Sequence, residues 1–463
     1  MFRSACLASL VLPILCASLL SAEYKVGPSE KVTKISEIAD KLTPGDVVEL
    51  TGDITDSMVL KASGTAEKPI VIRGTGGRRK IDFAGARNGI ETRGDYYVFE
   101  GLELTGAAFR GIFQVSHGIV IRDCYFHDNQ NGIMGADDPN TGDITIEYCE
   151  FFHNGSGIYA HQMYLASWKP GAKAVVQFNY IHDSSGGLNI KSRMPHNVIR
   201  YNWIENAANY ECDIVDSDEG PAGLRPMNTE FIGNVVVTGA AGNPHHKLNL
   251  GSDQPRSPGT EGVFTIANNT FIMRRASDEN HVIRVGGNVA EARFYNNIFV
   301  APGLKDFRVL VIEDTAAQSG EPGTPGRLKK LTGSGNFIAE NAVSVPKEFT
   351  NTVRAADAGF TDIANLKVTL AKGSPCIGAG DKSAPMDAHY SPVRGMVFVV
   401  GARPSQPIKE YYRPGRGEML DIRLLQRHSA AKIGRIDIGA FGQTIDSISD
   451  GPAAPPGVEL NLK

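Results

Sequence analysis

A short alternation of apolar and polar positions, followed by a polar turn, recurs along the middle of the chain. Seven segments share it: "IVIRDCYFHDNQNGI", "ITIEYCEFFHNGSGI", "AVVQFNYIHDSSGGL", "NVIRYNWIENAANYE", "NTEFIGNVVVTGA", "FTIANNTFIM" and "ARFYNNIFVAPG". In each segment an alternating strand leads to a Cys or Asn anchor. The anchors are Cys124, Cys149, Asn179, Asn202, Asn234, Asn269 and Asn297, and no spacing between them falls below 23 residues.

A unit of two or three short strands cannot bury its own apolar side, whereas stacked units can. Strands of successive units would pair in parallel, about 4.8 Å apart, so that like residues stack on like. Asn at a turn tolerates left-handed backbone geometry and hydrogen-bonds locally. A sandwich would not repeat the anchor, the leucine lattice of a leucine-rich repeat is missing, and a propeller needs more even units. The pattern therefore predicts an all-β parallel solenoid.

The N-terminal segments "ISEIADKLTPGDVVELTGDI" and "GTAEKPIVIRGTGG" resemble the opening of right-handed parallel β-helix proteins of the pectate-lyase-like superfamily. More narrowly, they are similar to the group that includes alginate lyases and chondroitinase B. The resemblance covers roughly residues 30 to 303. It implies an N-terminal capping helix and a β-helix over residues 23–303. Irregular rungs and loops over residues 304–445 are expected to close the same domain, and a loose tail is expected over residues 446–463.

Composition and charge narrow the compartment and the partners. The 463 residues carry a net charge of −4, so no basic footprint indicates nucleic acid. Residues 1–22 resemble a secretory signal peptide, which predicts an extracellular or periplasmic protein. A membrane anchor and lipidation at Cys16 are the alternatives, and no other stretch is long enough to insert into a membrane. We expect a monomer. No two cysteines have CxxC spacing, which argues against a zinc site.

The stretch "SSGGLNIKSRMPHNVIRYN" places polar residues on alternate positions, as in a strand that displays one row to solvent. Counting from the anchors, His161 and Lys191 both lie 12 residues on, and a one-residue bulge would bring Asp213 beside Lys191. Rung by rung, the expected face carries Tyr159 and His161; Asn189, Lys191 and Arg193; Glu211, Asp213 and Asp216; His246, Lys247 and Asn249; and Arg284. Trp168, in an adjoining loop, offers an aromatic face for sugar rings.

This cluster suits β-elimination on a uronic-acid polymer. The reaction needs a neutralised substrate carboxylate, a base for the adjacent proton and an acid for the departing oxygen. "IKSRMPHNVIRYN" is similar to the lysine motif of the alginate lyase and chondroitinase B group, which implies Lys191 as the base. His161 or Tyr159 would be the acid. Where the family has a catalytic arginine, this chain has Glu211 and Asp213.

Several residues could bind or neutralise an acidic polysaccharide. Arg193, Lys247 and Arg284 are candidate carboxylate clamps. Further substrate contacts are expected from Asn189, Trp168 and His246. Calcium is a second way to neutralise the uronate, and Glu211, Asp213 and Asp216 supply the hard oxygen ligands that it prefers.

Other functions stay open at this point. A glycoside hydrolase would use Glu211 with Asp213 or Asp216 as its carboxyl pair. An epimerase would remove and return the same proton that a lyase removes. A noncatalytic carbohydrate-binding protein would use the same groove without chemistry. The face could also be an ordinary solvated sheet, on which ion pairs contribute little to stability.

Overall fold

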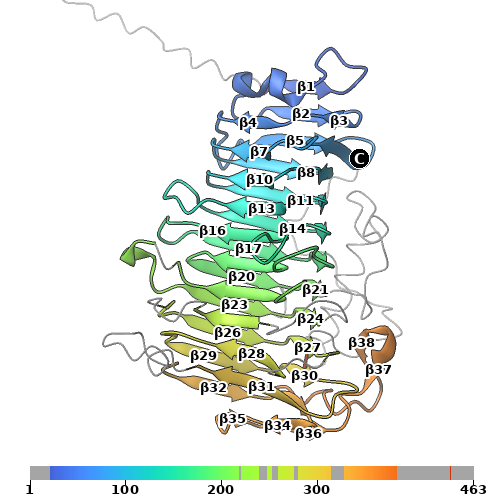
Figure 1. Ribbon diagram of the computed structural model, residues 1–463, viewed down its shortest axis with the longest axis vertical. Coiled ribbons are helices and arrows are strands. Elements are labelled where there is room, and N and C mark those ends of the chain that lie inside the picture. The colour runs from blue at the N-terminus through green and yellow to red at the C-terminus, as the bar shows by residue number, and fades with distance from the viewer. Residues whose placement is uncertain are drawn as a thin grey trace, which may run out of the picture.

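The computed structural model describes residues 21–217, 220–238, 248–252, 259–275, 280–313, 328–382 and 438–439. Within these residues the chain winds into a column of stacked rungs, with its N-terminal rungs at one end and residues 349–355 at the other (Figure 1). Each full rung contributes one strand to each of three long parallel sheets.

We call these sheets A, B and C. Within the described residues, sheet A contains β1 (Glu23–Val26), β2 (Val47–Leu50), β5 (Ile70–Gly74), β8 (Tyr97–Glu100), β11 (Ile119–Arg122), β14 (Ile144–Glu147), β17 (Lys173–Gln177), β20 (His196–Arg200), β23 (Asn228–Ile232), β26 (Val263–Ala267), β29 (Glu291–Tyr295), β32 (Leu331–Ser334) and β35 (Phe349–Thr350). Sheet B contains β3 (Ile54–Thr55), β6 (Arg79–Asp82), β9 (Leu102–Thr105), β12 (Tyr125–His127), β15 (Glu150–Phe152), β18 (Tyr180–His182), β21 (Trp203–Glu205), β24 (Val235–Val237), β27 (Thr270–Ile272), β30 (Ile298–Val300), β33 (Phe337–Ala339) and β36 (Val353–Ala355).

Sheet C contains β4 (Met58–Leu60), β7 (Asn88–Thr92), β10 (Arg110–Gln114), β13 (Asn131–Gly135), β16 (Met163–Ala166), β19 (Ile190–Arg193), β22 (Cys212–Val215), β25 (Leu248–Gly251), β28 (His281–Val285), β31 (Phe307–Ile312) and β34 (Ala342–Ser344). A separate antiparallel pair joins β37 (Phe360–Asp362) to β38 (Lys367–Leu370). Short 3-10 helices occur at η1 (Ile35–Glu37), η2 (Ala39–Lys41), η3 (Ala222–Leu224) and η4 (Ile363–Asn365).

The core lies inside the column, where each sheet directs alternate side chains. On β11, for example, Ile119 and Ile121 are buried, while Val120 and Arg122 are partly exposed. Like residues stack between rungs, as with the rings of Phe126 and Phe151, whose centroids lie 4.6 Å apart. The alternation in the sequence is therefore the alternation between the core and the outer faces of the column.

All seven predicted anchors form one buried ladder between sheets A and B, which confirms the repeat. Each asparagine side-chain oxygen accepts a hydrogen bond from the backbone N–H of the preceding anchor, at 2.8–3.0 Å. Asn336 adds an eighth residue to the ladder, because its side-chain oxygen accepts from Asn297. The residue before each asparagine has a positive φ, for example 58° at Phe178 and 57° at Tyr201. The ladder thus holds a left-handed turn that costs non-glycine residues energy.

The structure differs from the expected capping helix at the N-terminal end. The segment after Lys34 forms η1 and η2, which are single 3-10 turns, and buries Ile35, Ile38, Ala39 and Leu42 over the first rungs. The short turns still cover the apolar end of the core.

The rungs continue beyond residue 303, through β31 to β36, because the Asn336 step repeats the ladder pattern. The expected signal peptide lies outside the described residues except for positions 21 and 22. The expected tail over 446–463 and most of 383–445 also lie outside them. Among the described residues, no helix has the length and apolar character needed to cross a membrane.

Candidate functional site

A row of polar side chains crosses the outer face of sheet C. Tyr164 on β16 pairs with Lys191 on β19, and Lys191 pairs with Asp213 on β22. The row continues from Asp213 to Asn249 on β25 and from Asn249 to Arg284 on β28. The sequence correctly predicted that Asp213 lies beside Lys191, although the strand reaches this register without the expected bulge, through regular pairing from Cys212 onward.

Hydrogen bonds connect this row from strand to strand. Lys191 Nζ lies 2.8 Å from Asp213 Oδ2, and Asn249 Nδ2 donates to Asp213 Oδ1 at 2.6 Å. Arg284 Nη1 donates to Asn249 Oδ1 at 2.7 Å, while its Nη2 binds Glu313. Asp213 is only 2% exposed, so its charge is balanced by these contacts rather than by water.

Tyr164 occupies the place beside Lys191 that counting from the anchors gave to His161. The reason is that the turn between sheets B and C differs in length: it runs from Phe152 to Met163 in one rung and from His182 to Ile190 in the next. Aligning the alternation "MYLA" with "IKSR" would have found Tyr164, because both segments place small or apolar residues at the inward positions.

Tyr164 lies beside two cations of the neighbouring strand β19, Lys191 and Arg193, and keeps its proton. Burial, with help from Asp137, raises the pKa of its hydroxyl, while Arg193 and Lys191 oppose that shift. Arg193 hydrogen-bonds the Tyr164 side chain and also donates to the backbone oxygen of Asp216. Arg193 is only 8% exposed. Its guanidinium therefore contacts protein groups rather than solvent, and it holds the Tyr164 side chain in place.

His161 lies close to this pair but is buried. Its ring stacks at 5.9 Å from the Tyr164 ring, and its Nδ1 accepts a hydrogen bond from the Leu188 N–H at 3.1 Å. Burial and the Lys191 charge lower the pKa of His161 to about 3. The imidazole is therefore neutral near pH 7, with its proton on Nε2.

Two other expected residues lie apart from the row. Tyr159 is in the turn 157–159 and is 86% exposed, so nothing orients it as an acid. Trp168 is partly buried, and its Nε1 donates to Ser217 Oγ at 3.1 Å. This bond links the loop after β16 to the residues that follow β22. Arg193 donates to the backbone oxygen of Asp216 in the same segment, so Trp168 and Arg193 contact neighbouring residues there.

Asn189 was expected on the displayed row, and that placement is wrong. It is fully buried, and its Nδ2 donates to Glu211 Oε2 at 2.7 Å and to the Glu205 carbonyl at 2.9 Å. The strand begins at Ile190, so Asn189 belongs to the turn, where alternation does not apply. Glu211 lies in the corresponding turn of the next rung, directly before β22, and accepts from the Ala207 N–H.

The three carboxylates expected to bind calcium are held separately. Glu211 bonds Asn189, Asp213 pairs with Lys191, and Asp216 accepts from the Gly259 N–H at 3.1 Å. Asp216 also lies 3.6 Å from Arg225. In the part of the chain that the structure describes, no three His, Cys, Asp or Glu side chains form a group that could hold a metal ion. His246 and Lys247 lie outside the described residues.

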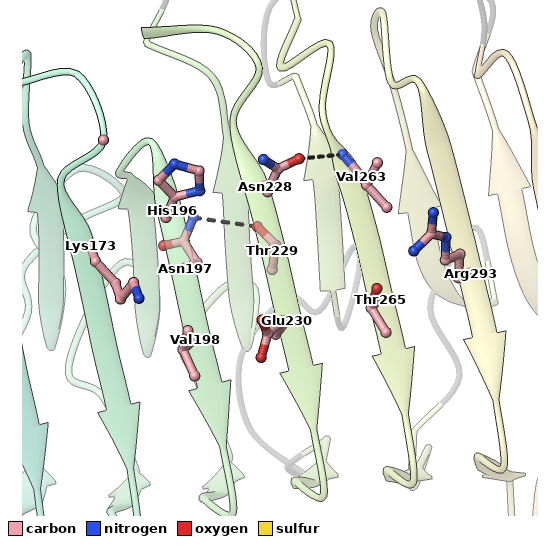
Figure 2. A pocket seen from close by; sticks show the side chains of 11 residues that line it. Lys173, His196, Asn197, Val198, Asn228, Thr229, Glu230, Val263, Thr265 and Arg293 are labelled. Carbon is pink, nitrogen blue, oxygen red and sulfur yellow. Dashed lines mark hydrogen bonds between the residues drawn. The ribbon is translucent and has the colours of Figure 1, made fainter. Parts of the chain in front are cut away.

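A groove of about 500 Å³ lies on the outer face of sheet A, not on sheet C (Figure 2). Lys173, His196 and Glu230 extend into it from the neighbouring strands β17, β20 and β23, and Arg293 from β29, two strands beyond Glu230. Burial and the Lys173 charge lower the pKa of His196. None of the described residues expected in the catalytic site lines this groove, so it provides a separate surface for control variants.

The comparisons with known proteins agree with this architecture. Residues 70–236 match the family model of the right-handed β-helix region. The fold is a right-handed parallel β-helix. The resemblance noted in the N-terminal sequence is thus confirmed for the fold. No curated protein matches the sequence.

Similar solved structures include three carbohydrate-active proteins. Pectate lyase Pel9A is 13% identical, with a TM-score of 0.46, and the match covers 92% of this chain and 98% of that one. A PL6 family polysaccharide lyase from Pseudopedobacter saltans is 13% identical, with a TM-score of 0.42 and coverage of 74% and 94%. The GH136 lacto-N-biosidase from Eubacterium ramulus is 12% identical, with a TM-score of 0.38 and coverage of 72% and 66%. These likenesses assign no activity to this chain.

Proposed function

We propose that the protein is a secreted polysaccharide lyase that cleaves a uronate-containing polysaccharide by β-elimination on the outer face of sheet C. The observation that supports this most directly is the Tyr164–Lys191–Asp213 row. It places a hydroxyl that keeps its proton on one side of an amine and a carboxylate on the other. A base and an acid within one strand spacing, about 4.8 Å, suit the two proton transfers of an elimination.

Lys191 acts as the base in this proposal. Its proton passes to Asp213 Oδ2 along the 2.8 Å contact, which leaves a neutral amine. The amine takes the proton beside the uronate carboxylate, the bond to the departing oxygen breaks, and a carbon–carbon double bond forms. Asn249 holds the second oxygen of Asp213 and keeps the carboxylate in place for this exchange.

Tyr164 replaces the expected acids Tyr159 and His161. Its hydroxyl gives a proton to the departing oxygen, and the resulting phenolate is stabilised by the positive charges of Arg193 and Lys191. The proton held by Asp213 then returns to the phenolate through Lys191, so that the cycle closes. Of the described arginines expected to neutralise the substrate carboxylate, Arg193 lies on the same strand as Lys191, whereas Arg284 lies three strands away. Arg193 is therefore the one that supplies positive charge near the substrate carboxylate in this proposal. Calcium that arrives with the polysaccharide is a second proposed source of charge.

The decisive experiment measures ultraviolet absorbance during incubation with alginate, pectate and glycosaminoglycans, with and without calcium. The expected result is a rising signal on one polymer, its loss in Lys191→Ala, and its retention in the groove variant His196→Ala. New reducing ends without absorbance would indicate a hydrolase, and an altered sugar configuration without cleavage would indicate an epimerase. Binding without any reaction would leave a carbohydrate-binding protein, and each of these three outcomes contradicts the lyase.

In this proposal the protein acts as a monomer and is located outside the cytoplasm. Each candidate group in the Tyr164–Lys191–Asp213 row comes from one chain. Light scattering of the mature protein and fractionation of the producing cells test these two points. A dimer, or retention in the cytoplasm, would contradict them.

A further inference from the structure

Arg110 is clamped between two aromatic rings at the start of β10. Its guanidinium carbon lies 3.9 Å from the centre of the Phe109 ring and 4.0 Å from that of Phe113. Its Nε donates to Met134 Sδ at 3.0 Å, and its Nη1 donates to Asn88 Oδ1 at 3.3 Å. These four contacts fix the plane of the guanidinium before any ligand arrives.

This cation is partly buried without a carboxylate partner. Among the described residues, no acidic side chain lies within ion-pair distance of Arg110. The nearby Glu91 bonds Asn88 at 2.9 Å and forms its ion pair with Arg93. Burial, with help from the Arg87 charge, lowers the pKa of Arg110. An arginine nonetheless keeps its charge in proteins, so Arg110 is a partly desolvated cation that forms no ion pair with a described acidic side chain and is attracted only at longer range by Glu91.

Arg110 also lies on the face that carries the proposed catalytic row. Arg110 contacts Met134 on β13, Met134 pairs with Tyr164, and Tyr164 pairs with Lys191. Three strand spacings separate β10 from β19, which corresponds to about 14 Å along the column. An extended ligand on sheet C could therefore meet Lys191 and Arg110 at the same time.

We infer that Arg110 is a carboxylate-binding subsite for an acidic saccharide that extends from Lys191 towards the N-terminal rungs. This inference rests on the proposed function for the identity of the ligand. A guanidinium presents paired N–H donors that match the two oxygens of a carboxylate. The flanking Phe109 and Phe113 reduce competition from water and hold the donors in one orientation. Arg110 binds the polymer in this account and takes no part in bond cleavage.

The test measures binding of uronate oligosaccharides of increasing length to the full chain carrying Lys191→Ala, which prevents turnover. Isothermal titration calorimetry is expected to show about 10- to 100-fold weaker binding of the long oligosaccharides after Arg110→Met. Short oligosaccharides that cannot span the distance should bind equally to both proteins. Arg73→Met is the matched control, because Arg73 lies on sheet A and pairs with Glu49.

The possible results separate this subsite from the proposed function. Length-dependent weakening by Arg110→Met, together with a parent protein that produces no unsaturated product from any polymer, supports the subsite and overturns the lyase. Unchanged binding after Arg110→Met, together with a parent protein that does cleave the polymer, overturns the subsite alone. Absence of any uronate binding by the parent overturns both. If Arg110→Met fails to fold, Arg110→Lys keeps the charge but not the paired donors, and unchanged binding there overturns the subsite.

Discussion

Lys191 and Asp213 occupy paired positions on β19 and β22, and their Nζ and Oδ2 atoms lie 2.8 Å apart. The lysine side chain is 12% exposed and the aspartate side chain 2%. Asp213 is also bonded to Asn249, and through it to Arg284. The base candidate is therefore one end of a hydrogen-bonded row that crosses four strands, and its surroundings predict both stability and turnover.

Replacing Asp213 alone should destabilise the protein. Asp213→Leu leaves the Lys191 ammonium and the Asn249 amide without their shared partner, and we expect a loss of about 3 kcal/mol in the free energy of unfolding. The double variant Lys191→Met/Asp213→Leu should recover the part of that loss that comes from the unpaired ammonium, because an apolar pair needs no compensation, whereas the Asn249 amide still lacks its partner. Chemical denaturation of the four proteins measures the coupling. A double variant as unstable as Asp213→Leu would contradict an unpaired Lys191 ammonium as a source of the loss.

Tyr164→Phe removes only the hydroxyl that the proposed mechanism uses as its acid. We expect kcat to fall by about 100-fold or more with little change in KM, because the ring still packs against His161. Arg193→Met should lower kcat, because the Tyr164 phenolate loses a cation that stabilises it. The same loss raises the pKa of Tyr164, so the alkaline limb of the pH–rate profile should move to higher pH. Steady-state kinetics across pH checks both variants. Full activity of Tyr164→Phe would remove Tyr164 from the reaction.

The sequence predicted the ladder residues because each asparagine marks the same local turn. Asn179 and Asn202 each follow a residue in the left-handed conformation, and the two are hydrogen-bonded to each other in the ladder. It predicted the Lys191–Asp213 contact because both residues lie in regular strands. It missed Tyr164 because turn lengths between sheets B and C vary, so residue counting loses register there. It misplaced Asn189 because that residue precedes the strand, where alternation does not apply. Strand periodicity does not predict which outward side chains become buried, because this depends on contacts between neighbouring loops, such as the hydrogen bond from Trp168 to Ser217.

His161 makes stability depend on pH. Burial and Lys191 lower its folded-state pKa from 6.5 to about 3, so between these values the unfolded chain binds a proton that the folded chain does not. Stability from this site is therefore full above pH 6.5 and declines as pH falls, by about 3 kcal/mol at pH 4.5. His161→Gln should abolish this component. The difference in unfolding free energy between parent and variant, measured from pH 7.5 to 4.5, should shrink by that amount; a difference independent of pH would contradict the buried neutral imidazole.

Asn234→Ala should destabilise the column more than its small size suggests. The Asn234 side chain accepts from the Asn202 backbone and side chain and donates to the Ile199 carbonyl, all in buried surroundings. Its loss leaves several buried polar groups without partners, each costing about 1–3 kcal/mol. We expect a total of about 3 kcal/mol, seen as a lower melting temperature by calorimetry. The matched control is Asn288→Ala, whose exposed amide bonds Glu261 at 3.3 Å and should change stability by less than about 0.5 kcal/mol. Equal effects of the two substitutions would mean that the ladder accompanies the fold without stabilising it.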